Sequence, residues 1–180
     1  MSRKTAKLAF DKIPSLGASH GNLLILHGLF GSKSNFRSLA KRPEMSGNRD
    51  VYLVDMRNHG ESEHRDSHQV EDMAADIGRF LDDRGLDKAV LLGHSMGGKA
   101  AMEAALELQD RVEGLIVADV GPFDYIGFAL NNTSILELMQ SLDLKKFEKK
   151  DQVHKVFLDH LNGNKLVADF RRVVQNPAVD

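Results

Sequence analysis

The stretch "VLLGHSMGGKAAMEAA", residues 90–105, decides the fold of this chain. An apolar run ends at Gly93, a serine stands between Gly93 and Gly97, and a segment rich in alanine follows. Small residues on both sides of a serine allow a sharp turn from a strand into a helix, which presents the hydroxyl to a substrate. The stretch therefore predicts a nucleophilic Ser95 at a strand–helix junction. The alternative is a tight turn with an incidental serine.

Strands and helices alternate on both sides of this junction. Short apolar runs predict strands, and amphipathic or capped segments predict helices: strands at 7–10, 22–28, 50–57, 88–93 and 111–119, and helices at 32–43, 68–85 and 96–108. Such alternation predicts an α/β fold, a mostly parallel sheet with helices on both faces. After this the pattern changes to three consecutive helices at 134–147, 151–161 and 164–174. We therefore expect a core over residues 1–121 and a helical cap over 122–180.

Composition excludes several classes of function. The chain has 180 residues, 42% of them apolar and 28% charged, and a net charge of −2, so no basic field points to nucleic acid. No stretch approaches the roughly 18 apolar residues of a membrane span. The absence of cysteine excludes disulfides and thiolate ligands. His64 and His68 have helical spacing without an acidic third ligand, so we expect no metal.

The start of the chain bears on its location. Basic residues open it, but no long apolar segment follows, so a secretory signal is not expected. We predict a cytoplasmic protein. The mitochondrial matrix is the alternative, because Arg3, Lys4 and Lys7 precede the first acidic residue, Asp11.

Acyl transfer needs two N–H donors for the negative oxygen that forms in the transition state. The residue after the nucleophile, Met96, supplies one candidate. The segment "HGLFG" (27–31) follows an earlier strand, and the Leu29 N–H is the second candidate, with Phe30 nearby. The alternative for this segment is a turn that only ends a strand.

The segment "DMRNHGES" (55–62) also ends a strand. Asp55 and Arg57 could be mistaken for catalytic residues. We interpret them as ordering the loop through charge pairing and side-chain-to-backbone hydrogen bonds. His59 is interpreted as part of the same turn.

Together, "HGLFG", "DMRNHGES" and "GHSMG" resemble the α/β-hydrolase fold in their order and spacing. "LHGLFGSKSNF", "GHSMGGKAAM" and "VADVGPFDY" are similar to the small esterases of the YbfF type and their mitochondrial abhydrolase relatives, over residues 6–170. The resemblance implies a serine hydrolase that takes a small-molecule carboxylic ester or thioester through an acyl-enzyme, without a cofactor. Phe30 and His94 are then expected to bind substrate. An apolar face of the cap is expected to line the acyl pocket: Ile135, Leu138, Met139 and Leu142.

The resemblance also implies an acid and a histidine that follow the serine along the chain. In this branch the acid follows the strand after the nucleophile helix, which is Asp119; Asp124 is the alternative. The histidine is expected after later strands that have no counterpart here, so we expect a chain that is incomplete at its C-terminal end. His154 and His160 are the histidines downstream of the serine, and both are interpreted as cap-helix residues rather than the base.

Two hypotheses follow. In the first, the chain represents an esterase or thioesterase, with acyl transfer to another acceptor or perhydrolysis as variants of the same chemistry. In the second, it is a catalytically impaired, truncated hydrolase-fold protein that binds an acyl ligand or a protein partner. An unpaired sheet edge would favour self-association in the second case.

Overall fold

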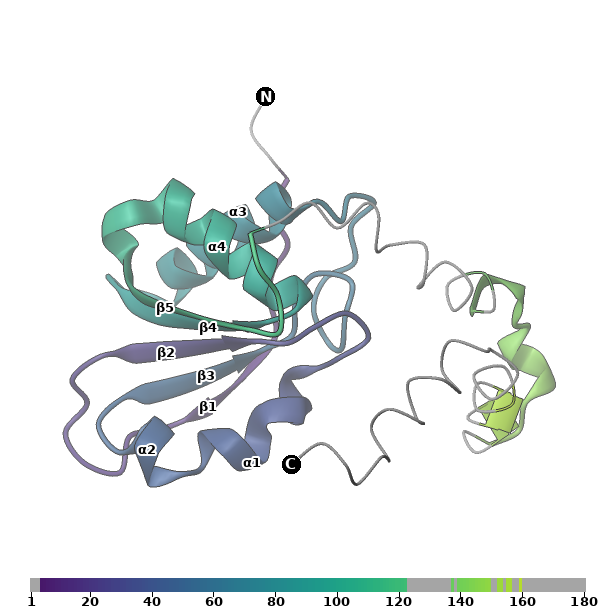
Figure 1. The fold of residues 1–180 in the computed structure, drawn as a ribbon, viewed down its shortest axis with the longest axis horizontal. Coiled ribbons are helices and arrows are strands. Elements are labelled where there is room, and N and C mark those ends of the chain that lie inside the picture. The colour runs from purple at the N-terminus through teal and green to yellow at the C-terminus, as the bar shows by residue number, and fades with distance from the viewer. Residues whose placement is uncertain are drawn as a thin grey trace, which may run out of the picture. The chain divides into compact units, whose positions relative to one another are not determined.

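The computed structural model describes residues 4–122, 137, 139–149, 152–153, 155–156 and 159. Its core is a five-stranded sheet with the order β1-β3-β2-β4-β5 (Figure 1). The strands are β1 (Phe10–Ile13), β2 (Asn22–Leu26), β3 (Asp50–Val54), β4 (Ala89–His94) and β5 (Val112–Ala118). All neighbours pair in parallel except β1, which runs antiparallel to β3 at one edge. The predicted α/β fold with a mostly parallel sheet is confirmed.

Two long helices have nearly the bounds that the sequence predicts. They are α3 (Val70–Arg84) and α4 (Met96–Leu108), the second followed by η2 (Gln109–Arg111). Helix α3 ends at Gly85, which adopts a left-handed φ of 63° that glycine tolerates better than other residues.

The predicted helix at 32–43 is wrong as a single element. The segment folds instead into η1 (Lys33–Phe36), α1 (Arg37–Ala40) and α2 (Pro43–Ser46). Pro43 occupies the first turn of α2, where its missing N–H needs no partner. The strand predicted at 7–10 is displaced as well, since β1 begins only at Phe10.

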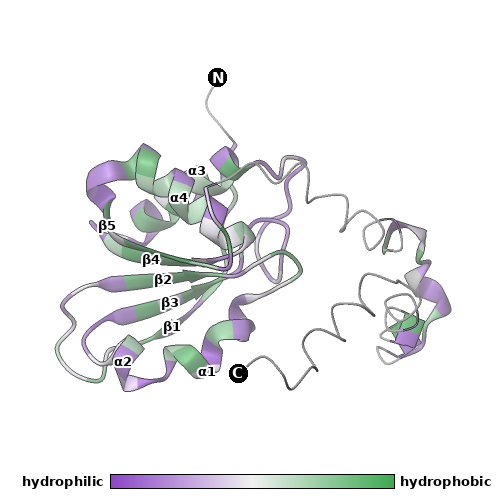
Figure 2. Cartoon of the chain, viewed as in Figure 1, coloured by the Kyte–Doolittle hydropathy of each residue, from purple (hydrophilic) through white to green (hydrophobic). Residues whose placement is uncertain are grey.

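The sheet has an apolar layer on each face, and Figure 2 shows the central strands β2, β3 and β4 as largely hydrophobic. Leu24 and Leu26 of β2 pack with the α3 and α4 side, whereas Leu23 and Ile25 pack with the α1 and α2 side. Successive side chains of a strand point to opposite faces. Because both faces are covered, the strand appears in the sequence as a continuous apolar run.

The chain divides into two compact units, Met1–Phe123 and Asp124–Asp180. In the second unit the described residues include a helical stretch around Met139–Ser141 and η3 (Leu144–Lys146). Of the predicted cap face, Met139 is exposed and Leu142 is half-buried, while Ile135 and Leu138 lie outside the described residues. The predicted boundary at 121/122 stays a prediction. Within the described residues, no helix has the length and apolar character needed to cross a membrane.

Candidate active site

Ser95 lies at the junction of β4 and α4, where the chain turns sharply. Its backbone has φ 51° and ψ −115°, and its side chain makes no capping hydrogen bond to the helix that follows. A non-glycine residue at positive φ costs on the order of 1–3 kcal/mol, which the surrounding structure must offset. The Ser95 N–H donates to the carbonyl of Ala118 at 3.0 Å, so the end of β5 helps to hold the turn.

The glycines around Ser95 allow the turn to pack against β2. A Cβ atom on Gly93 would lie 2.3 Å from the carbonyl oxygen of Gly97. A Cβ atom on Gly97 would lie 2.4 Å from the carbonyl oxygen of Leu26, at the end of β2. Neither position has room for a side chain, so the predicted strand–turn–helix geometry needs both glycines.

Both predicted oxyanion donors border this turn. Met96 opens α4, and the first N–H groups of a helix have no partner within it. Leu29 lies in a tight turn that is closed by the Gly31 N–H donating to the Gly28 carbonyl at 3.0 Å. A Cβ atom on Gly28 would come within 3.2 Å of the Ser95 Cβ, so this turn reaches the serine. Among the residues that the structure describes, the Leu29 N–H meets no hydrogen-bond acceptor.

A cavity of about 310 Å³ opens beside the serine turn. It is lined by His27, Gly28, Leu29, Phe30, Gly31, Asn35, Phe36 and His94. The volume lies at the lower end of the range for small-molecule sites. The structure therefore places Phe30 and His94, the predicted substrate-binding residues, on the wall of one cavity with the predicted donor Leu29.

Asp119 follows β5, with a left-handed φ of 58°. Its side chain is 85% exposed, and its Oδ2 lies 3.6 Å from Nε2 of His94. This separation is longer than a hydrogen bond. The side chains of His94 and Ser95 both lie against Gly28. Asp119 therefore lies near His94, which lines the cavity. Its role as the acid stays a prediction.

Other sequence predictions about the site fall partly or wholly outside the described residues. The alternative acid Asp124 and the histidines His154 and His160 lie there. Within the described part, no group of three or more histidine, aspartate or glutamate side chains is placed to hold a metal ion. There His68 contacts Asn58 rather than His64. The expectation of a site without metal or cofactor stays a prediction.

Asp55 orders the loops beside the site, as predicted, but it pairs with Lys33 rather than with Arg57. Its carboxylate accepts the backbone N–H groups of Lys33 at 2.7 Å and Glu61 at 3.0 Å, and lies 3.1 Å from the Lys33 ammonium. Burial alone would raise the pKa of Asp55. The two N–H groups and the ammonium more than offset burial and hold that pKa below its usual range.

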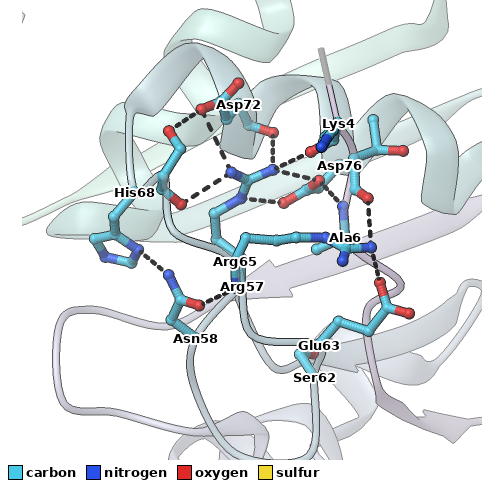
Figure 3. Close-up of polar contacts among 12 residues, drawn as sticks. Lys4, Ala6, Arg57, Asn58, Ser62, Glu63, Arg65, His68, Asp72 and Asp76 are labelled. Atoms are coloured by element: carbon cyan, nitrogen blue, oxygen red, sulfur yellow. Dashed lines mark hydrogen bonds and ion pairs between the residues drawn. The ribbon is translucent and has the colours of Figure 1, made fainter.

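Arg57 is fully buried beneath the same loop, where it pairs closely with Asp76 of α3 and at 3.4 Å with the carboxylate of Asp72 (Figure 3). Its Nε donates to Asp76 Oδ2 at 2.6 Å and its Nη2 to Asp76 Oδ1 at 2.8 Å. The remaining guanidinium N–H groups reach the carbonyls of Ser67, Asp72 and Lys4. The role of Asp76 was not predicted from the sequence. The sequence held one signal for this role, which is that Asp76 lies next to the apolar positions of the amphipathic helix predicted at 68–85.

The free energy of unfolding is expected to fall as the pH drops through the range below 6.5, the usual pKa of histidine. Burial of His27 disfavours its charged form and lowers its pKa, and the hydrogen bond to the Gly28 carbonyl does not reverse this. Below pH 6.5 the unfolded chain takes up a proton at His27 that the folded chain does not. The contribution of His27 to the free energy of unfolding is therefore fully present above pH 6.5, and it is lost as the pH falls toward the pKa of His27 in the folded chain. Urea midpoints at several pH values measure this. In a His27→Gln variant, the urea midpoints above and below pH 6.5 should differ less than in the unsubstituted protein. An unchanged pH dependence would contradict the assignment of this effect to His27.

Comparison with known proteins gives three related results. A family model described as the alpha/beta hydrolase fold matches residues 21–176. The mouse sn-1-specific diacylglycerol lipase ABHD11 is 50% identical over 100 residues, which are 56% of this chain and 33% of the relative. The Escherichia coli esterase YbfF is 33% identical over 145 residues, 79% of this chain and 56% of the relative.

Among solved structures, a marine microorganism esterase superposes with a TM-score of 0.79 at 32% identity. The match covers 91% of this chain and 62% of that chain. The chain therefore spans about half or less of the length of the curated relatives it matches.

Proposed function

Because the chain belongs to the α/β-hydrolase fold family, we propose that it is a serine hydrolase acting on carboxylic esters or thioesters. The observation that carries the proposal is Ser95, held at φ 51° between β4 and α4 with its side chain beside Gly28. A strained serine at this junction, bordered by backbone N–H groups, is the arrangement that acyl transfer requires. The relatives named esterase and lipase support an ester substrate.

In the proposed reaction, Ser95 Oγ attacks the acyl carbon and loses its proton to a histidine. The N–H groups of Leu29 and Met96 stabilise the oxyanion, and the protonated histidine passes its proton to the departing alcohol or thiol. Water then attacks the acyl-enzyme and releases the acid. Asp119 is proposed to orient the histidine. The identity of that histidine, and the cytoplasmic or mitochondrial location, stay predictions.

The cavity beside the serine supports an acyl group as the ligand. Leu29, Phe30 and Phe36 contribute apolar surface to its lining, and His94 contributes an imidazole. Phe30 is 55% exposed and Leu29 43% exposed, so apolar surface is available to a substrate chain. Apolar lining with a few polar groups is typical of small-molecule sites.

A fluorophosphonate probe tests the proposal, because it reacts with an activated serine. The expected result is one probe per chain, located at Ser95 by peptide mapping, together with hydrolysis of p-nitrophenyl butyrate. Turnover of a short ester, a diacylglycerol and an acyl thioester, compared at equal concentration, assigns the substrate class. Labelling at another residue would overturn the proposal.

A second candidate is the impaired protein that binds an acyl ligand or a partner. It is favoured by β5, which pairs only with β4 among the described strands and carries Leu115 and Ile116 at 40% and 49% exposure. Apolar side chains on an edge strand favour association. Binding of an acyl ligand, or dimerisation, without any labelling of Ser95 would support this candidate over the hydrolase.

A further inference from the structure

Two loops meet where the parallel strands β2 and β3 end. The first contains His27 and Gly28, and the second contains His59 and Gly60, so each carries a His-Gly pair. The Asp55 carboxylate already joins the second loop to Lys33. The two histidines make a further connection, which links the second loop to the turn that carries Leu29.

His27 reaches from the first loop into the second. It is 1% exposed, and its Nε2 accepts the backbone N–H of Met56 at 3.1 Å. Its Nδ1 lies 2.8 Å from the carbonyl oxygen of Gly28 in its own loop. A backbone N–H can only donate and a carbonyl can only accept. His27 is therefore neutral, with its proton on Nδ1.

His59 makes the reciprocal contacts. Its Nε2 accepts the backbone N–H of Phe30 at 3.3 Å, and its Nδ1 lies 2.9 Å from the carbonyl oxygen of Arg57 in its own loop. The same reasoning assigns a neutral ring with the proton on Nδ1. The centroids of the His27 and His59 rings are 5.1 Å apart, with an interplanar angle of 63°.

The contact with Phe30 acts on a strained turn. Phe30 has a φ of 62°, a conformation that costs a non-glycine residue free energy, so contacts must hold it. The His59 bond holds the peptide group between Leu29 and Phe30. It also occupies the Phe30 N–H, which leaves the Leu29 N–H as the donor of this turn toward the serine.

We propose that His59 is a positioning residue for the oxyanion hole: by accepting the Phe30 N–H, it fixes the turn that aims the Leu29 N–H at the space beside Ser95. This inference rests on the proposed function of Ser95. His59 itself does not touch the reacting atoms. Its anchor is the Arg57 carbonyl, and the buried ion pair between Arg57 and Asp76 keeps that carbonyl in place.

Two variants separate positioning from general support of the fold. His59→Gln keeps an acceptor oxygen at about the reach of Nε2, whereas His59→Leu keeps the bulk and has no acceptor. Loss of one oxyanion donor costs about 10²–10³-fold, and a displaced donor should cost less, so we expect labelling of Ser95 to slow about 10- to 100-fold in His59→Leu. His59→Gln should recover most of that rate, and urea midpoints should show whether both variants are folded.

A spectroscopic measurement tests the same contact without catalysis. Nitrogen chemical shifts of the His59 ring in the unsubstituted protein should identify a protonated Nδ1 and an unprotonated Nε2. Amide exchange at Phe30 should be slow in the unsubstituted protein and in His59→Gln, and fast in His59→Leu.

The outcomes distinguish this inference from the proposed function. Equal labelling rates in the unsubstituted protein and in folded His59→Leu would overturn the positioning role, as would a proton on Nε2 of His59. If the unsubstituted protein is not labelled at Ser95 while the ring and amide measurements are as expected, the proposed function fails. The hydrogen bond from Phe30 to His59 would then remain as a structural contact without a role in catalysis.

Discussion

Replacing Ser95 with alanine is expected to lower ester turnover by on the order of a million-fold, which is the cost of losing the nucleophile in a serine hydrolase. The variant keeps the Cβ atom and the backbone, and removes only the oxygen that would bond to the acyl carbon. Release of p-nitrophenol from p-nitrophenyl butyrate measures the rate, and intact mass after fluorophosphonate treatment measures labelling. Turnover within tenfold of the unsubstituted protein would show that the reaction occurs elsewhere.

Two further substitutions serve as controls for this experiment. Ser19→Ala removes an exposed hydroxyl that bonds the carbonyl of Gly21, far from the proposed chemistry in sequence, and should leave turnover unchanged. Ser95→Gly should be as inactive as Ser95→Ala and yet more stable by about 1 kcal/mol, because glycine adopts the positive φ at this position without strain. Urea midpoints of the two Ser95 variants make the comparison. A less stable glycine variant would contradict the assignment of strain.

Replacing Arg57 with leucine is expected to destabilise the core by about 3–5 kcal/mol, the cost of leaving one member of a buried ion pair without its partner. Both side chains of the pair with Asp76 are buried. Among the described residues, Asp76 would keep only the Ala6 N–H as a partner (Figure 3). The carbonyls of Lys4, Ser67 and Asp72 would lose the N–H groups that Arg57 donates to them. Urea unfolding measures the loss.

Matched variants show whether the loss of stability in Arg57→Leu comes from leaving a buried charge unpaired. Arg49→Leu removes a partly exposed pair with Glu113 and should cost far less, because exposed ion pairs contribute little to stability. The double variant Arg57→Met with Asp76→Leu should recover part of the loss, because no charge stays buried. If Arg57→Leu gives no folded protein, Asp76→Asn provides a measurable substitute, since it keeps an oxygen for the Ala6 N–H. A cost for Arg57→Leu no larger than that of Arg49→Leu would contradict the prediction.

Much of the fold could be predicted because its signals are local. The apolar run before Gly93 and the alanines after Gly97 place β4 and α4, and spacing of three and four places α3. The segment around Pro43 was less predictable. Its three short helices depend on how they pack against β3, which propensity does not report.

The candidate site could be predicted in part for the same reason. Ser95 and Met96 follow from the pattern of one turn, and Leu29 follows from a glycine-rich segment after an earlier strand. His59 was interpreted only as part of a turn. The repeated His-Gly pair was a signal for its role, but spacing alone does not say which ring bonds to which loop.

The sequence by itself determined the central strands, the serine turn and the two long helices, because each depends on residues within about a dozen positions of one another. The parallel sheet followed from the alternation of these strands and helices along the chain. Only the tertiary structure decided that Arg57 pairs with Asp76, 19 positions away, and that His59 accepts the N–H of Phe30, 29 positions away. Both contacts join the loop after β3 to a segment distant in sequence, α3 in one case and the turn after β2 in the other. The direction of each side chain there is set by the packed backbone and not by local spacing.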